Sequence, residues 1–155
     1  MRVRRANAAD IPAMMALDRE SPSAAHWSPQ LYEGLFVAIS GDQRSERVVW
    51  VAEGESAPPE VLGFLVAHKV DVEWELENIT VAGAFRRRGI GMRLLREFIA
   101  HAQAEQGSGI FLEVRESNRS ARALYREAGF EETALRRSYY SNPAEDAILC
   151  RLKLY

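Results

Sequence analysis

The chain has 155 residues, of which 47% are hydrophobic and 27% are charged, a composition typical of an ordinary globular protein. This length predicts a single domain, residues 1–155, with a sizeable buried core. The net charge of −2 gives no basic field for a nucleic-acid partner, and no apolar run is long enough for a membrane span or a signal peptide. The single cysteine, Cys150, excludes an internal disulfide, so we predict a cytoplasmic protein.

The N-terminal region predicts one strand and two helices. Residues 2–6 are strand-like, and residues 10–20 predict a helix with Asp10 as its N-cap. After a loop, Ser28 opens a second short helix with a proline in its first turn. Trp27 lies at that boundary, where it faces either a substrate or the protein core.

Three β-type runs follow a polar turn over residues 41–46. Residues 47–53 and 61–70 predict an antiparallel hairpin, and residues 72–81 predict a further strand. Alternation places three glutamates of that last strand on one face. That face is either a solvent-exposed edge or an acidic wall that attracts an amine; its residues are Glu73, Glu75 and Glu77.

A helix and a strand complete a crossover unit with residues 72–81. Apolar residues recur at helical spacing from Ile90 to the glycines at 107–109, and residues 110–115 then predict a strand. Such a crossover should be right-handed, with parallel strands.

The C-terminal part predicts one more helix and two strands. Asn118 or Ser117 caps a helix that stops at Gly129. Residues 130–135 and 146–154 predict the closing strands. The order of elements therefore predicts a mixed α/β sheet domain.

The turn over residues 86–91, Arg-Arg-Arg-Gly-Ile-Gly, joins the strand of this crossover to its helix. A basic turn that opens a helix presents unpaired backbone N–H groups and a positive dipole at one point, and the arginines suit a ligand with more than one phosphate. The two glycines would let the backbone approach a phosphate closely. The alternative is a solvated basic turn.

Two other phosphate motifs, a metal site and a nucleophilic cysteine are excluded on spacing. A P-loop requires Gly-Lys-Ser/Thr, whereas Gly91 precedes Met92, and a dinucleotide fingerprint requires a small residue where Leu94 stands. The three histidines lack metal-ligand spacing. Cys150 alternates with polar residues in a strand and is interpreted as a small buried hydrophobe.

The turn resembles the acyl-CoA pyrophosphate loop, Gln/Arg-x-x-Gly-x-Gly/Ala, of the GCN5-related N-acetyltransferase (GNAT) family. Segments that follow the order of that family cover nearly the whole chain: 78–81, 112–118, 123–125, 129–130, 136–140 and 145–148. Together they resemble its ribosomal-protein-alanine (RimI-type) branch. The resemblance implies a central mixed, mostly antiparallel sheet flanked by helices, acetyl-CoA as co-substrate, no metal, and direct transfer of acetyl to a protein N-terminal α-amine in a ternary complex.

The same resemblance assigns Glu113 as the general base. An α-amino group has a pKa of ~7.7–8.0, so a modest base is sufficient, and the apolar sequence neighbours of Glu113 predict a raised pKa. The alternative for Glu113 is a structural pair with an arginine. Glu75 occupies the position of the base in lysine-acetylating relatives, so both glutamates remain candidates.

The resemblance also assigns Tyr125 as the acid that protonates the coenzyme A thiolate, although its helical spacing alone indicates a core residue. Tyr139 and Tyr140 either grip the acceptor or close a sheet edge, and the N–H of Val81 would stabilise an oxyanion. Asn118 has a second possible role as the helix cap. The residues expected to bind the coenzyme are Ile79, Val81, Arg87, Arg88, Gly89, Ile90, Gly91, Met92 and Asn118.

Two alternatives stay open. One keeps the enzyme but changes the acceptor to a lysine side chain or a small-molecule amine. The other is a non-catalytic acyl-CoA-binding module with the same fold. The sequence indicates neither an oligomeric state nor a preference for acyl-chain length.

Overall fold

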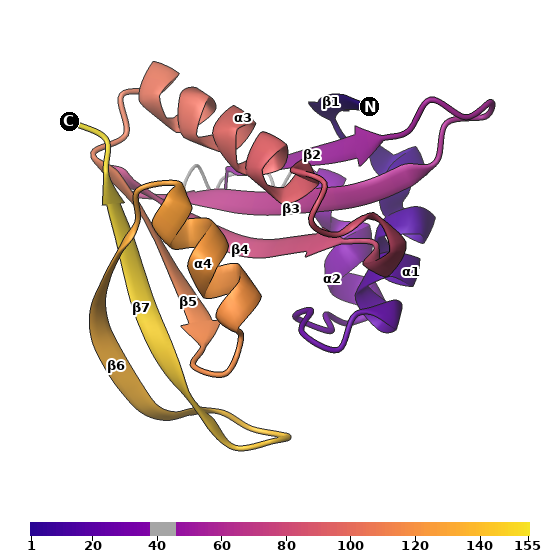
Figure 1. The fold of residues 1–155 in the computed structure, drawn as a ribbon. Helices are drawn as coiled ribbons and strands as arrows, with labels where there is room; N and C mark the ends of the chain where they lie inside the picture. The colour runs from indigo at the N-terminus through magenta and orange to yellow at the C-terminus, as the bar shows by residue number, and fades with distance from the viewer. Residues whose placement is uncertain (38–45) are drawn as a thin grey trace.

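The computed structural model describes residues 1–37 and 46–155 (Figure 1). The predicted polar turn over residues 41–46 lies, apart from Glu46, outside the described residues. In chain order the elements are β1 Arg2–Arg5, the 3-10 helix η1 Ala8–Asp10, α1 Ile11–Glu20, α2 Pro29–Glu33, η2 Gly34–Phe36, β2 Arg47–Glu53, β3 Val61–Val70, β4 Glu73–Val81, η3 Gly83–Phe85, α3 Ile90–Ala104, β5 Gly109–Arg115, α4 Arg119–Glu127, β6 Glu131–Tyr140 and β7 Glu145–Lys153.

The strands form one seven-stranded sheet in the order β1-β2-β3-β4-β5-β7-β6. Only the pair β4–β5 is parallel, and all other neighbours are antiparallel. The predicted mixed, mostly antiparallel sheet and the parallel crossover through α3 are therefore confirmed. The last strand, β7, lies between β5 and β6, which leaves β6 at the edge (Figure 1).

Helices cover both faces of the sheet. Side chains of β3 alternate between these faces and so contribute to two hydrophobic cores. Leu65 and Ala67 pack with α3 in one core, whereas Phe64 and Val66 pack with α1 and α2 in the other. Three apolar residues of α3, at helical spacing, are fully buried, and each stabilises the fold by roughly 1.5–3 kcal/mol; they are Leu94, Leu95 and Phe98.

A β-bulge interrupts β4 at Glu77. Leu76 pairs with Ala67 and Asn78 pairs with Val66, so Glu77 has no residue opposite to it. The bulge reverses the alternation, and Ile79 and Val81 pack against the core on the α3 side. β4 is a central strand, so the interpretation of its acidic face as a sheet edge is wrong.

Two details at element ends differ from the sequence analysis. Asp10 stands at the N-cap position of α1, but its carboxylate binds Arg4 and the N–H of Asn7 instead of capping the helix. Asn7 provides the capping side chain one turn earlier. β6 extends to Tyr140, beyond the predicted end at Leu135, through an irregular pairing with β7. Within the described residues, no helix is long and apolar enough to cross a membrane.

Candidate active site

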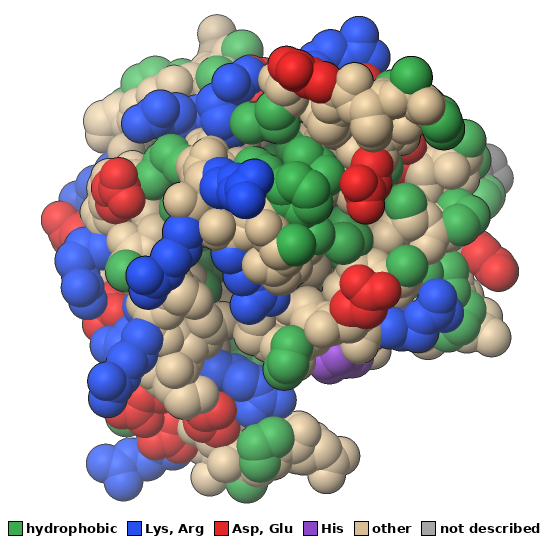
Figure 2. Space-filling model, turned by 45° about the vertical axis from the view of Figure 1, so that its right-hand side comes forward, with side chains coloured by type: hydrophobic (Ala, Val, Ile, Leu, Met, Phe, Trp, Pro, Cys, Tyr) green, Lys and Arg blue, Asp and Glu red, His purple; other side chains and the backbone are tan. Residues whose placement is uncertain are grey.

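The site is a groove that opens where β4 and β5 diverge. Their pairing ends at Glu75 and Phe111, although β4 continues to Val81 and β5 to Arg115. The groove has a volume of about 1240 Å³, which exceeds the ~300–1,000 Å³ of ordinary small-molecule pockets. Figure 2 shows basic side chains, in blue, beside a recess near the centre of that face, and the basic residues that line the groove are arginines.

The groove brings together every site residue that the sequence analysis named. They come from the strand before the α3 loop, from the loop itself, from β5 and from α4, which are separated by up to 46 positions in the chain but line one continuous space. The residues are Ile79, Val81, Arg87, Arg88, Gly89, Ile90, Gly91, Met92, Glu113, Asn118 and Tyr125.

Unpaired backbone N–H groups gather at the start of α3. The first helical hydrogen bond runs from the N–H of Arg93 to the carbonyl of Gly89, and no side chain caps the helix. Within the described chain, the N–H groups over residues 87–92 donate to no protein acceptor. Arg87 (φ 62°) and Gly89 (φ 80°) adopt left-handed conformations. This loop therefore leaves unpaired the N–H groups that the sequence predicts, and their binding of a phosphate remains a prediction.

The two glycines of the loop are required for different reasons. Gly89 has open space around it and is needed for its positive φ. A Cβ on Gly91 would lie 3.3 Å from Cδ2 of Leu124, so this glycine lets α3 approach α4 closely. Close approach to a ligand phosphate was the predicted reason for both glycines; at Gly91 the contact is with the protein itself.

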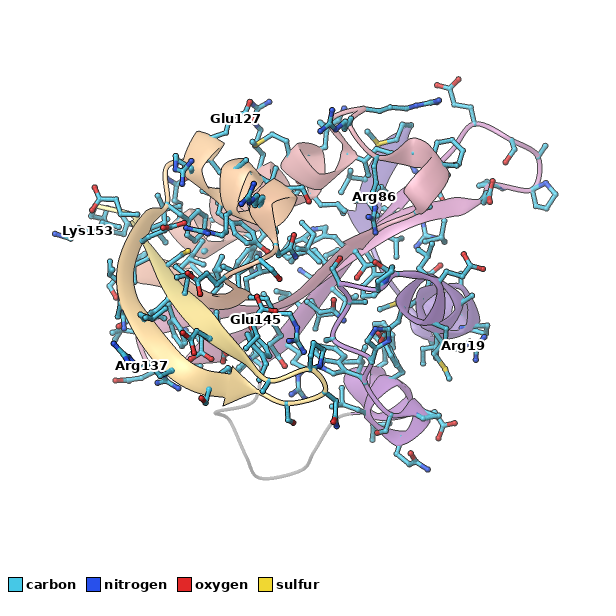
Figure 3. All side chains as sticks on the ribbon, turned by 60° about the horizontal axis from the view of Figure 1, so that its bottom comes forward. Arg19, Arg86, Glu127, Arg137, Glu145 and Lys153 are labelled. Carbon is cyan, nitrogen blue, oxygen red and sulfur yellow. The ribbon has the colours of Figure 1, made fainter. Side chains whose placement is uncertain are left out.

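The three arginines are also not equivalent. The guanidinium of Arg86 donates to the carbonyl of Val81 (3.3 Å) and to the hydroxyl of Ser21 (2.7 Å), so it ties the loop to the end of α1 (Figure 3). Arg88 lies over the ring of Phe85, 5.3 Å from its centroid. Arg87 and Arg88 line the groove and are the two that we predicted to bind the coenzyme.

β4 presents backbone groups to the groove. The N–H of Ala82 bonds the carbonyl of Leu62 and Val81 stands opposite Gly63, so antiparallel alternation directs the N–H groups of Ile79 and Val81 away from β3. β5 does not pair with this part of β4. These groups therefore face the gap between the two strands.

Glu113 is paired with a cation. Nη1 of Arg136, on β6, lies 3.1 Å from Oε1 of Glu113, whose side chain is only 14% exposed. Oε2 of Glu113 is buried and accepts no hydrogen bond within the described residues. The structure therefore shows the alternative of a pair with an arginine, although local sequence does not reveal which arginine the fold brings to Glu113.

Glu75 lines the same groove, and its carboxyl has a raised pKa. Burial raises the pKa of its carboxyl, and the negative charges of Glu77 and Glu113 raise it further, while His68 and Arg47 lower it. Glu73 pairs with Arg151 and Glu77 with Arg47. Glu73 and Glu77 are thus each paired with an arginine, and Glu75 is the member that lines the groove with a raised pKa.

Tyr125 is buried among α4 and β7 residues and also lines the groove. Burial raises the pKa of its phenol, with smaller contributions from Cys150 and Tyr140. The phenol therefore stays protonated at neutral pH and remains a hydrogen-bond donor. Asn118 accepts from the N–H of Ala121 as the cap of α4, and its predicted contact with the coenzyme remains a prediction.

Aromatic residues line the other end of the groove. Trp27 packs on Tyr32, with ring centroids 5.5 Å apart, and also borders the groove, so it belongs to the core and to the surface at once. Tyr139 and Tyr140 meet edge to face at 5.0 Å, and Arg115 lies 4.3 Å above the ring of Tyr140.

Sequence reasoning did not single out a buried carboxylate that organises the loop after α1. Asp18 is 2% exposed and accepts from the N–H groups of His26 (2.8 Å) and Trp27 (3.1 Å) and from the hydroxyl of Tyr32. An aspartate near a helix C-terminus was the only local sign of it. Within the described residues, no group of three His, Cys, Asp or Glu side chains is arranged to hold a metal ion.

Residues 11–130 match the acetyltransferase (GNAT) family. The [ribosomal protein bS18]-alanine N-acetyltransferase of Salmonella typhimurium is 32% identical over 147 residues, 94% of this chain and 92% of that protein. N-alpha-acetyltransferase RimI of Mycobacterium tuberculosis is 46% identical over 79 residues, 51% of this chain and 48% of that protein. An uncharacterized Mycobacterium leprae protein is 46% identical over 87 residues, 56% of this chain but only 23% of its own length.

Solved structures agree in fold. The ribosomal-protein-S18-alanine N-acetyltransferase of Escherichia coli superposes with a TM-score of 0.78 at 27% identity, over 99% of this chain and 93% of that one. Arabidopsis thaliana NAA60 in complex with acetyl-CoA superposes with a TM-score of 0.83 at 17% identity, over 98% and 97% of the two chains. From its sequence match and its fold together, the chain belongs to the GNAT family of acetyltransferases.

Proposed function

We propose that the protein transfers the acetyl group of acetyl-CoA to the α-amino group of a protein N-terminus, and that residues 1–155 act as one acetyltransferase domain. One observation carries the proposal: a single groove is lined both by unpaired backbone amides and by two carboxylates, Glu75 and Glu113. The names of the Salmonella and E. coli relatives make the N-terminal alanine of ribosomal protein bS18 the first acceptor to test.

Binding of the coenzyme would use the backbone more than side chains. The N–H groups over residues 87–92 suit a diphosphate, and the helix dipole adds to their potential. The outward backbone groups of Ile79 and Val81 suit the amide-bearing pantetheine arm, which would lie in the gap between β4 and β5. Asn118 borders the same path.

The reaction needs a neutral amine. Glu113, or Glu75 across the groove, would take a proton from the acceptor's ammonium group, and the freed lone pair would attack the thioester carbonyl. The N–H of Val81 is oriented to stabilise the resulting oxyanion. When the C–S bond breaks, the thiolate gains a proton and the attacking nitrogen loses its second proton, which restores the proton donor. Tyr125 is the candidate donor, and because its pKa is raised, donation must accompany bond cleavage.

The acceptor class is tested with a matched pair of peptides. The protein is incubated with acetyl-CoA and a peptide beginning Ala-Arg, or with the same peptide blocked at its α-amine, and the released thiol is measured. We expect thiol release with the free peptide only. Equal turnover of the blocked peptide contradicts N-terminal transfer, and binding of acetyl-CoA without thiol release to any amine indicates a non-catalytic module.

A second acceptor class has one observation in its favour. Glu75 holds the position of the base in lysine-acetylating relatives, lines the groove and has a raised pKa. The alternative acceptor is therefore a lysine side chain or a small-molecule amine, and it predicts turnover of the α-blocked peptide when that peptide contains lysine.

A further inference from the structure

A histidine on β3 lies next to Glu75, on the side of β4 that faces away from the gap between β4 and β5. His68 on β3 is paired with Glu75 on β4 in the sheet register, so the two side chains project side by side from one face. Nε2 of His68 lies 3.5 Å from Oε2 of Glu75. His68 does not line the groove, and its side chain is 22% exposed. His68 therefore lies between Glu75 and solvent.

The second nitrogen of His68 is held by a buried ion pair. Nδ1 of His68 lies 2.7 Å from Oε1 of Glu77, the residue at the β-bulge. Arg47 on β2 donates to both oxygens of Glu77, at 2.9 and 3.2 Å. Nδ1 of His68 makes no hydrogen bond within the described residues, so Glu77, whose charge Arg47 balances, acts on the imidazole through its charge, and the strand register places Nε2 near Glu75.

We propose that His68 is a positioning residue that receives, through Glu75, the proton that the acceptor amine loses. The inference rests on the proposed function. In this proposal Glu75 and His68 carry the proton. Arg47 and Glu77 form the charged pair beside His68 on the side away from Glu75.

The proton balance of this step is simple. An N–H bond of the acceptor's ammonium group breaks and an O–H bond forms on Glu75, which leaves the lone pair on the amine. The O–H bond then breaks and an Nε2–H bond forms on His68, while Nδ1 keeps its own hydrogen beside Glu77. The resulting imidazolium lies between two carboxylates, which favour its charge, and the Nε2–H bond then breaks to pass the proton to water, because Nδ1 is buried.

The charges around Glu75 are consistent with this role. It faces His68 from β3, Glu77 on its own strand and Arg47 from β2. The other titratable groups near Glu75 are Glu113 on β5 and Tyr139 on β6, and Tyr139 lies beside Arg136. Burial and the two other carboxylates raise the pKa of Glu75, whereas His68 lowers it. Without His68, the proton would leave Glu75 more slowly.

The test combines removal of the imidazole with its return as a small molecule. In His68→Ala, we expect kcat to fall at least about tenfold, with KM for acetyl-CoA unchanged because His68 lies outside the groove. Added imidazole should restore kcat in proportion to the concentration of its neutral form. Because that concentration rises with pH, the rescue should also increase with pH. His68→Gln, which fills the space left by the ring but cannot accept the proton, should lose as much activity.

Several outcomes would overturn the inference. Activity of His68→Gln at the wild-type level with the wild-type pH profile would do so, as would an absence of rescue by imidazole in a folded His68→Ala. Glu75→Gln combined with His68→Ala should be no slower than Glu75→Gln alone, and additive losses contradict a relay through Glu75. Thermal melting checks folding. A wild-type protein that releases no thiol with any amine contradicts the proposed function instead.

Discussion

Arg136 on β6 and Glu113 on β5 form an ion pair of 3.1 Å, and of the two only Glu113 lines the groove. The two strands are not neighbours, because β7 lies between them, so the arginine reaches over an intervening strand. The Arg136 side chain is 55% exposed, whereas that of Glu113 is 14% exposed. The cation is therefore the partner free to move, and an incoming ammonium group would replace it beside the carboxylate.

Glutamine substitution should separate the two candidate bases. We expect Glu113→Gln to lower kcat by roughly 10²–10⁴-fold if Glu113 is the general base, with affinity for acetyl-CoA kept. Glu75→Gln should show the larger loss if Glu75 is the base instead. Glu73→Gln is the matched control, since this glutamate pairs with Arg151 outside the groove. Equal activity of all three variants and the wild type would contradict carboxylate catalysis here.

Removal of Arg136 should favour the acceptor. The amine must displace this arginine from Glu113, and a partly exposed ion pair stabilises by roughly 0.2–1 kcal/mol. Arg136→Ala should therefore lower KM for the acceptor peptide by up to about fivefold, with KM for acetyl-CoA unchanged. Steady-state kinetics with each substrate varied in turn provide the measurement. A raised KM for the acceptor would show that Arg136 binds the peptide instead.

The raised pKa of Glu75 has a consequence for stability. A carboxyl whose pKa is higher in the folded state stabilises the fold while protonated, and this contribution is lost as pH rises through the folded pKa. Glu75→Gln does not titrate, so it should be more stable than the wild type at pH 7. The difference should shrink as pH falls through the folded pKa and should be lost below the ordinary glutamate value of about 4.3. Urea unfolding across that range measures it, and a difference independent of pH contradicts the assignment.

The left-handed turn at Gly89 should tolerate asparagine better than alanine. Gly89 has a φ of 80° and open space at its Cβ position, so the penalty of a side chain there is conformational. Gly89→Ala should destabilise the protein by about 1–2 kcal/mol and weaken acetyl-CoA binding, because the N–H groups of the loop would shift. Gly89→Asn should lose less, since asparagine adopts this conformation more readily. Denaturant unfolding and calorimetry compare the two.

Asp18 should be essential to the loop that carries Trp27. Its buried carboxylate accepts three hydrogen bonds. In asparagine an NH2 group replaces one of the two oxygens, so at least one of the N–H or O–H groups that now donate to Asp18 would lose its acceptor. We expect Asp18→Asn to cost about 2–3 kcal/mol of unfolding free energy. Asp146→Asn is the control, because that aspartate accepts one backbone N–H of Ser138 at the surface. Comparable losses in both variants would contradict a special role for Asp18.

Local sequence was sufficient for most of the fold. Strands β2 and β3 begin and end where their apolar runs do, and α3 starts at Ile90 and buries the stripe predicted for it. These features depend on side-chain periodicity and turn residues, which act over a few neighbouring positions. The anion-binding loop is local for the same reason: its unpaired amides follow from one turn and one helix start.

The environment of each glutamate depended on contacts distant in sequence. The partner of Glu113 lies 23 positions further along the chain, on a strand that the sheet order separates from it. His68 meets Glu75 only because the β3–β4 register places them opposite each other, and the bulge then brings Glu77 to the same imidazole. Sequence alone thus determined the elements and the acetyltransferase loop. Tertiary structure decided which carboxylate is paired with an arginine and which has a raised pKa, because burial and charge at a side chain are set by whatever strand the fold brings beside it.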